Sequence, residues 1–287
     1  MISPLVSPLT APARTAAAPS VLMCAPTHFT VQYAINPWMD PSVPTHVERA
    51  LSQWADLKAT YESLGWTVDV VASVEGLPDM VYAANGALVI DGLAYTASFL
   101  YRERHGEASA YAAWLAGAGY RVVHSTAVNE GEGDFLLVGD AILAGTGFRS
   151  TLASHAEVRE VFGREVVTLT LVRPEYYHLD TALAVLDARP GCEQVAYLPS
   201  AFDAASLAIL EARYPNAIRV DEADAAVLGL NVVSDGLNVV MPARATRFAQ
   251  QLAERGFRPI AVDLSELLKG GGAVKCCTLA LRTGDGR

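Results

Sequence analysis

Short apolar segments, turns and amphipathic stretches follow one another in a recurring order along the chain. The segment 86–123 predicts a strand, a hairpin turn at Asp91-Gly92, a second strand, a helix followed by a glycine, and a third strand. The expected bounds of its strands and helix are 87–90, 93–97, 108–116 and 120–123. The same order recurs in residues 230–264, with a turn at Asp235-Gly236 and a helix over 244–254.

The two ends of the chain complement each other. Residues 47–64 predict a helix that precedes a strand, but no hairpin strand opens this unit. The C-terminal segment 277–281 predicts a lone strand with no helix after it. Residues 135–171 and 182–220 fit the repeating order less cleanly. We therefore expect one unit to be split between the two ends, so that the repeats close into a ring.

A polar residue or a cysteine stands just before the first strand of each unit. These positions are Asn85, Asp134, Asp180, Asn231 and Cys276, at intervals of 49, 46, 51 and 45 residues. Periods of this length are typical of solenoids and propellers. The pattern predicts an α/β propeller of five ββαβ units with pseudo-fivefold symmetry, whose five polar positions converge near the axis. An ordinary doubly wound sheet is the alternative, but it alternates strand and helix strictly, whereas hairpins recur here.

The N-terminal segment differs from the rest of the chain. Residues 1–20 are rich in Ala, Pro and Ser and carry a single charge, Arg14. Prolines interrupt any apolar run of the kind that a secretory signal requires. We therefore expect a disordered tail over residues 1–20 and one domain over residues 21–287.

Composition narrows the class of protein. Apolar residues make up 52% of the 287 residues and charged residues 18%, which argues against a disordered regulator. The net charge of −10 disfavours nucleic acid and membrane surfaces as partners and is compatible with a cationic small-molecule substrate. No apolar run reaches the roughly 18 residues of a membrane span. The four cysteines are too few for a disulfide scaffold and form no CxxC pair, so a reducing cytoplasm is the expected location.

Cys276 is a candidate nucleophile. It follows Gly270-Gly271-Gly272, where the absence of side chains lets the backbone come close to a ligand. Lys275 is expected to lower the pKa of the thiol, and a thiolate is a strong nucleophile. The alternative is a buried structural cysteine that follows a loop.

His178 and Asp180 are candidates for acid–base chemistry. If the chain enters a strand here, the two side chains share one face, which would place a general acid/base beside a carboxylate. A structural histidine is the alternative. The loop Glu130–Asp134 is acidic and spaced by glycines; its alternative is a solvated turn, and the ligand spacing of an EF-hand is absent. No dinucleotide or phosphate-loop motif is present.

Six motifs together resemble one family. The chain is similar to the guanidino-group-modifying superfamily, which includes dimethylargininases, arginine deiminases and glycine amidinotransferases. The resemblance covers residues 21–282 and implies a five-bladed α/β propeller, the pentein fold. The branch that it favours contains bacterial dimethylargininase-like proteins and the catalytic domain of arginine dihydrolase. The motifs are Met23–Phe29, Ile35–Met39, Pro78–Asn85, Glu130–Asp134, Tyr177–Asp180 and Gly270–Cys276.

The resemblance implies a role for each of several residues. Cys276 would be the nucleophile, because the family pattern Cys-x-Ser/Thr fits Cys276-Cys277-Thr278 with the first cysteine. His178 would be the general acid/base and Glu130 its orienting partner. The resemblance implies neither a cofactor nor a metal ion.

It also implies how substrate is held. Asp180 would bind the guanidinium through charge-assisted hydrogen bonds. Arg104 would bind the substrate carboxylate, with Arg102 as the alternate, and Asn36 would help to fix the amino-acid end.

One position departs from much of the family. Dimethylargininases and arginine deiminases usually have an aspartate where this chain has Asn85, whereas the arginine dihydrolase branch has asparagine. A neutral amide both donates and accepts, so it can bind a ureido carbonyl. The resemblance therefore implies first an arginine dihydrolase, which converts arginine to ornithine, ammonia and carbon dioxide. Dimethylargininase is the alternative; an amidinotransferase or a non-catalytic arginine-binding protein is less favoured, and a structural or interaction protein least.

Overall fold

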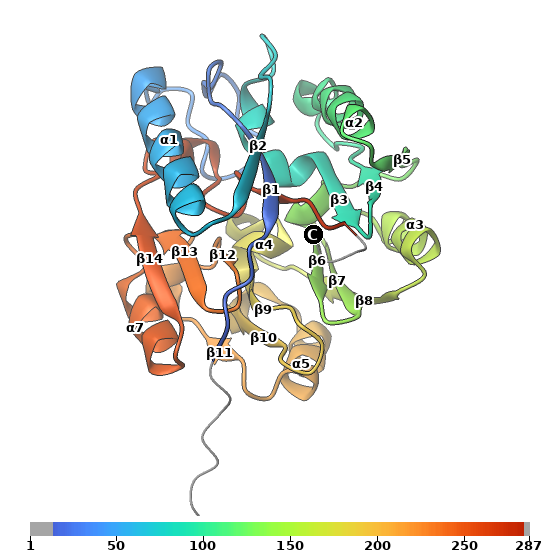
Figure 1. The fold of residues 1–287 in the computed structure, drawn as a ribbon, viewed down its shortest axis with the longest axis vertical. Coiled ribbons are helices and arrows are strands. Elements are labelled where there is room, and N and C mark those ends of the chain that lie inside the picture. Colours follow the sequence, from blue (N-terminus) through green and yellow to red (C-terminus); the bar gives the residue numbers. More distant parts are fainter. Residues whose placement is uncertain (1–13, 284–287) are drawn as a thin grey trace, which may run out of the picture.

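Five three-stranded sheets follow one another around a central axis, with helices on the outside of the ring (Figure 1). The structure is a computed structural model and describes residues 14–283. Each sheet is one blade of the propeller. The pseudo-fivefold ring of ββαβ units predicted from the sequence is therefore confirmed.

Each blade contains three of the fifteen strands found in residues 14–283. The first blade holds β15 (Leu279–Ala280), β1 (Ser20–Cys24) and β2 (Thr67–Val71), and the second holds β3 (Ala87–Ile90), β4 (Leu93–Thr96) and β5 (Arg121–Val123). The third holds β6 (Phe135–Val138), β7 (Ala141–Thr146) and β8 (Glu165–Thr170), and the fourth holds β9 (Leu183–Asp187), β10 (Gln194–Tyr197) and β11 (Ile218–Arg219). The fifth holds β12 (Val233–Ser234), β13 (Asn238–Pro242) and β14 (Arg258–Val262).

One long helix accompanies each blade. These helices are α1 (Val47–Ser63), α2 (Glu107–Gly117), α3 (Leu152–Phe162), α5 (Ala204–Arg213) and α7 (Thr246–Glu254), and all five lie at the periphery in Figure 1. Two short helices, α4 (Leu179–Ala182) and α6 (Glu222–Ala225), complete the α-helices of the described chain. Of these, α4 lies near the centre of the ring (Figure 1).

The second blade shows the strand pairing that all five blades share. Strands β3 and β4 pair antiparallel, with Leu88 opposite Tyr95, and β4 pairs parallel with β5 after the helix. The turn between β3 and β4 has positive φ angles at both Asp91 (52°) and Gly92 (74°). Two successive positive φ angles fit the right-handed twist of a hairpin, which is why Asp-Gly is favoured there.

The ring closes through the two ends of the described chain. Strand β15 pairs antiparallel with β1, with Val21 opposite Ala280, and β1 pairs parallel with β2. The backbone amide of Leu281 also donates to the carbonyl of Ser20 at 2.8 Å. The predicted split unit is confirmed.

Several inner strands are buried on both faces. For example, all four residues of the inner strand β3, Ala87–Ile90, are buried, so this strand is a continuous apolar run rather than an alternating one. The outer helices bury one side against the sheets; α1, for example, buries Ala50, Trp54, Leu57 and Tyr61. Within residues 14–283, none of the helices combines the length and the apolar character that crossing a membrane would require.

Three local expectations differ from the structure. The C-terminal strand begins at Leu279 rather than at 277, because Cys276 and Cys277 lie in a turn whose Cys277 amide donates to the Ala273 carbonyl. His178 immediately precedes helix α4 and not a strand. In the expected tail, Arg14 places its guanidinium 3.6 Å from the ring centre of Phe257. Residues 1–13 of that tail lie outside the described residues.

Candidate active site

The five polar positions that precede the inner strands meet around the axis. Asn231 accepts the backbone amide of Cys276 at 3.0 Å and donates to the carbonyl of Asp180 at 3.1 Å. Asp134 accepts the amide of Leu179 at 3.1 Å, and Asn85 lies 3.5 Å from the carbonyl of Glu130. All five side chains are buried. Residues 45 to 51 positions apart in the sequence therefore form one polar centre.

Cys276 lies at this centre with two polar neighbours. Its Sγ is 3.1 Å from Asn231 Nδ2 and 3.6 Å from Asp180 Oδ2. Burial, followed by the negative charge of Asp180, raises the pKa of the Cys276 thiol well above its usual value, while the Asn231 hydrogen bond opposes the rise. A cation placed beside Asp180 would remove the main charge that resists thiolate formation.

Lys275 does not contact this sulfur. Its ammonium binds Glu132 Oε2 and the carbonyl of Thr278, both at 2.9 Å. The expectation that Lys275 would lower the thiol pKa is therefore not met. Cys277 is also fully buried, and burial with the nearby Cys24 raises the pKa of its thiol.

His178 is held by Glu130. Its Nε2 lies 2.8 Å from Glu130 Oε2, and its Nδ1 is buried without a partner among the described residues. Although burial opposes ionisation, the charge of Arg149 and the His178 hydrogen bond hold the pKa of Glu130 well below its usual range. An ionised Glu130 requires a proton on Nε2, so Nδ1 is left as the nitrogen that can exchange a proton with a ligand.

Asp180 is a carboxyl group that is not matched by a cation of its own. Burial raises its pKa to about 7, although Lys275 and the hydrogen bonds from Cys276 and Asn231 act in the opposite direction. A bound guanidinium would restore the ionised form by supplying the missing positive charge.

Arg104 faces the site, whereas Arg102 does not. The Arg102 side chain is 89% exposed, and that of Arg104 is 4% exposed. Arg104 binds Glu107 through Nε (2.9 Å) and Nη2 (2.8 Å), and its Nη1 donates to Asn85 Oδ1 at 2.9 Å. Because a guanidinium only donates, this bond fixes the Asn85 oxygen toward Arg104 and its NH₂ group on the other side.

Asn36 is tied to the glycine loop that precedes the nucleophile. Its Nδ2 donates to the carbonyl of Gly270 at 3.1 Å, and the Tyr177 hydroxyl donates to the carbonyl of Gly271 at 2.8 Å. Gly271 has a φ of +88°, and a Cβ there would lie 2.6 Å from Asn36 Oδ1. A Cβ at Gly272 would in turn approach the Cβ of Cys276 to 3.0 Å. These close approaches explain the glycines at this point of the chain.

Two charged residues at the site were not anticipated. Arg149 Nη1 donates to both oxygens of Glu130 (3.0 and 2.8 Å), and its Nη2 donates to the Ile35 carbonyl at 2.7 Å. Asp79 accepts from the Tyr33 hydroxyl at 2.9 Å, while its Oδ1 is buried without a partner in the described chain. Asp79 lies inside the motif Pro78–Asn85, which could have drawn attention to it; no local pattern singles out Arg149.

The site contains the groups that nucleophilic attack by a thiol on a cationic substrate requires. A buried thiol lies beside an unpaired carboxyl group, and a histidine oriented by a carboxylate presents one free nitrogen. Within residues 14–283, no cluster of three or more His, Cys, Asp or Glu residues is placed to hold a metal ion.

Sequence comparison identifies relatives along almost the whole chain. Residues 25–283 match the family described as N,N-dimethylarginine dimethylhydrolase, eukaryotic. An N(G),N(G)-dimethylarginine dimethylaminohydrolase of Mycobacterium tuberculosis is 54% identical over 259 residues, which cover 90% of this chain and 84% of the relative. The bifunctional arginine dihydrolase/ornithine cyclodeaminase ArgZ of a Synechocystis species is 38% identical over 266 residues, covering 90% of this chain but 37% of that longer protein.

Solved structures agree with the sequence comparison. The N-terminal domain of ArgZ, a cyanobacterial arginine dihydrolase, was solved with substrate bound as a cysteine-to-serine variant. It superimposes on this chain with a TM-score of 0.88 at 36% identity, and the match covers 92% of this chain and 98% of that domain.

Proposed function

The chain belongs to the N,N-dimethylarginine dimethylhydrolase family of guanidino-group-modifying enzymes, and from this premise we propose that it is an arginine dihydrolase. The enzyme class is a hydrolase that acts on the carbon–nitrogen bonds of a guanidino group. The observation that carries the choice of activity is the orientation of Asn85. Arg104 holds its amide oxygen, and the NH₂ group makes one long contact of 3.5 Å to the Glu130 carbonyl, so its second N–H remains to bind the carbonyl of a ureido intermediate.

The charges of the site fit free arginine. Asp180 would hold the guanidinium beside Cys276. Arg104 and Arg149, both buried, would attract the α-carboxylate, and the unpartnered Oδ1 of Asp79 would accept from the α-ammonium. Asn36 would support this end through the glycine loop.

We propose a first hydrolysis with covalent catalysis. The guanidinium offsets the Asp180 charge, the thiol gives its proton to His178 Nδ1, and the Cys276 sulfur attacks the central carbon. His178, protonated at Nδ1, gives that proton to the leaving nitrogen, so ammonia departs and a thiouronium remains on the sulfur. Water then gives a proton to His178 and its oxygen to the carbon. The carbon–sulfur bond breaks, the second proton of the water passes to the sulfur, and citrulline is left in the site with the Cys276 thiol regenerated.

The second hydrolysis uses the same groups. The Asn85 NH₂ group would donate to the citrulline carbonyl oxygen, retain the neutral intermediate and polarise its carbon for another attack by Cys276. This attack would break the bond to the terminal nitrogen, which leaves as ammonia, and leave a thiocarbamate on the sulfur. Water would then break the carbon–sulfur bond, and the released carbamic acid would lose carbon dioxide to give ornithine. Overall, arginine and two water molecules give ornithine, two ammonia molecules and one carbon dioxide. The bound substrate in the ArgZ domain supports a small-molecule substrate at this site.

Dimethylargininase is a second candidate, favoured by the name of the 54% identical mycobacterial relative. It would cleave dimethylarginine to citrulline and dimethylamine with the same thiol chemistry. An amidinotransferase would additionally require a site for an acceptor amine.

Offering arginine, citrulline and dimethylarginine separately, with product analysis by mass spectrometry, distinguishes these functions. We expect ornithine to form from arginine and also from citrulline. The control Cys276→Ser should form neither citrulline nor ornithine from arginine. Citrulline as the sole product, from dimethylarginine or arginine, would replace the dihydrolase proposal with the dimethylargininase one.

The proposed location is the cytoplasm, because the mechanism needs a reduced Cys276 and all four cysteines are unpaired.

A further inference from the structure

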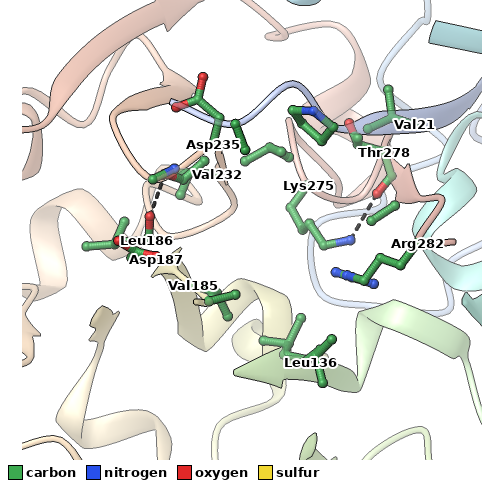
Figure 2. Close-up of a pocket in the computed structure, with 18 of the residues that line it drawn as sticks. Val21, Leu136, Val185, Leu186, Asp187, Val232, Asp235, Lys275, Thr278 and Arg282 are labelled. Atoms are coloured by element: carbon green, nitrogen blue, oxygen red, sulfur yellow. Dashed lines mark hydrogen bonds between the residues drawn. The ribbon is translucent and has the colours of Figure 1, made fainter. Parts of the chain in front are cut away.

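A cavity of about 480 Å³ lies between Lys275 and Arg282 on one side and Asp187 and Asp235 on the other (Figure 2). The inner strands β6, β9, β12 and β15 each contribute residues to this cavity. Lys275 and Thr278 also line the cavity, whereas Cys276 does not. Its volume is within the range of small-molecule sites, roughly 300–1,000 Å³.

Two cations share one carboxylate at one side of the cavity. Lys275 Nζ binds Glu132 Oε2 at 2.9 Å, and Arg282 Nη1 binds Glu132 Oε1 and the carbonyl of Val89. The Nε and Nη2 groups of Arg282 make no hydrogen bond within residues 14–283, although the side chain is only 31% exposed. The two cationic groups lie close to each other in Figure 2. The two cations, Lys275 and Arg282, exceed the single carboxylate of Glu132 by one positive charge. The Nε and Nη2 donors of Arg282 are not used by the described part of the chain.

The carboxylates on the opposite side are already engaged. Asp187 binds Arg189 through both oxygens (2.9 and 2.6 Å), and Arg14 lies 4.0 Å from it. Asp235 accepts the backbone amides of Leu237 (2.9 Å) and Asn238 (2.7 Å). A cationic ligand would have to displace these bonds, whereas an anion would find free donors on Arg282.

Apolar side chains complete the wall between the two charged sides. Val21, Leu136, Val185 and Val232 border the space in Figure 2. Burying an aliphatic body here would contribute about 25 cal/mol per Å² of apolar surface. We propose that this cavity is a binding site for a small carboxylate with a short aliphatic body, held by Arg282 with support from Lys275.

The site adjoins the catalytic segment without entering it. Lys275 precedes Cys276 in the chain, and Glu132 lies two residues from Glu130. The proposal does not depend on which guanidino substrate the enzyme uses, because none of the residues that hold the carboxylate holds substrate.

Hexanoate is a suitable probe, with hexylamine as the cationic control and sodium chloride as the ionic-strength control. Thermal unfolding of the full chain should show a midpoint that rises with hexanoate and saturates, as binding to the folded state requires. Hexylamine should produce no such rise. An unsaturable change, or an equal response to hexylamine, would overturn the proposal.

Three variants locate the site. Arg282→Met should weaken hexanoate binding about tenfold or more, as expected when a charge-assisted pair is lost. Val185→Phe should abolish binding, because the larger side chain fills the apolar part of the cavity without altering a charge. This variant keeps the test decisive if Arg282→Met does not fold. Arg121→Met, which changes a residue outside the cavity, should bind as the unaltered chain does. Unchanged hexanoate affinity in the cavity variants would place the probe elsewhere and refute the proposal.

Discussion

The side-chain amide of Asn231 contacts Cys276 at two points: Nδ2 lies 3.1 Å from Sγ, and Oδ1 accepts the Cys276 backbone amide at 3.0 Å. The two residues precede the first strands of neighbouring repeats, so the ring itself brings them together. The Oδ1 contact fixes the backbone of the nucleophile. The Nδ2 contact donates a hydrogen bond to the sulfur, which favours the thiolate over the thiol. Asn231 is thus in a position to set both the orientation and the ionisation of the sulfur.

Removing this donor should make the thiol harder to ionise. We expect Asn231→Ala to lower kcat/KM about 5- to 150-fold, since a lost buried hydrogen bond costs about 1–3 kcal/mol and 1.36 kcal/mol is a factor of ten. Asn231→Asp should be more damaging, because it adds a negative charge beside the sulfur. The rate of Cys276 alkylation by iodoacetamide as a function of pH is the measurement. Both variants should move its midpoint to higher pH; an unmoved midpoint with reduced activity would leave Asn231 only a structural role.

Cys276 rather than Cys277 should carry the covalent adduct. Cys276 faces Asp180 and Asn231, whereas the amide of Cys277 bonds back to Ala273 and its thiol is buried near Cys24. We expect Cys276→Ser to abolish turnover and Cys277→Ser to retain most of it. Peptide mapping after treatment with a haloacetamidine reagent checks the site of labelling. Labelling of Cys277 with Cys276 unmodified would reverse the assignment.

The fold could be predicted because its signals are local and repeated. Asp91-Gly92 and Asp235-Gly236 mark hairpins, and the regular positions before the inner strands give the period. Ring closure followed from the complementary ends, which β1 and β15 confirm. Each of these features depends on neighbouring residues or on a spacing that can be counted.

The details of the site depend on contacts that no local pattern encodes. Arg149 reaches the carbonyl of Ile35, 114 positions away in the sequence, and its role is invisible without the ring. His178 was expected to enter a strand, but Asp134 accepts the amide of Leu179 and stabilises the start of α4 instead. The resemblance favours Arg104 over Arg102 at the site, and the structure gives the physical reason: the short turn buries the Arg104 side chain and exposes that of Arg102.

Binding of arginine should weaken as the pH falls below about 7. Burial raises the pKa of Asp180 to about 7 in the empty site, and a guanidinium requires the ionised carboxylate. Below this pKa, binding must release a proton, so the Kd should rise up to about tenfold per pH unit; above it, the Kd should level off. Calorimetry on Cys276→Ser avoids turnover. Citrulline, whose ureido group is neutral, should show a weaker dependence, and an arginine Kd that is constant from about pH 6 to about pH 8 would contradict the role of Asp180.

Asn85 should decide whether the reaction stops at citrulline. Arg104 Nη1 holds the Asn85 oxygen at 2.9 Å, so the NH₂ group is the part of the amide that remains for a ligand. An aspartate would keep the contact with Arg104, but its second oxygen would face the ureido carbonyl of citrulline. Two acceptors would then oppose each other in a buried site, at a cost of about 1–3 kcal/mol per unsatisfied group. With the cationic arginine the same aspartate would be favourable, because it would pair with the guanidinium.

We therefore expect Asn85→Asp to consume arginine and release citrulline with little ornithine, whereas the native enzyme forms ornithine. The expected loss of citrulline retention is about 5- to 150-fold, because each 1.36 kcal/mol is a factor of ten. Time-resolved mass spectrometry of citrulline and ornithine measures the partition directly. Asn85→Ser is a matched control: it keeps a neutral donor, so it should form more ornithine per citrulline than Asn85→Asp. If Asn85→Asp forms ornithine as readily as the native chain, the amide at this position does not determine the product, and the argument that favours a dihydrolase over a dimethylargininase loses its structural basis.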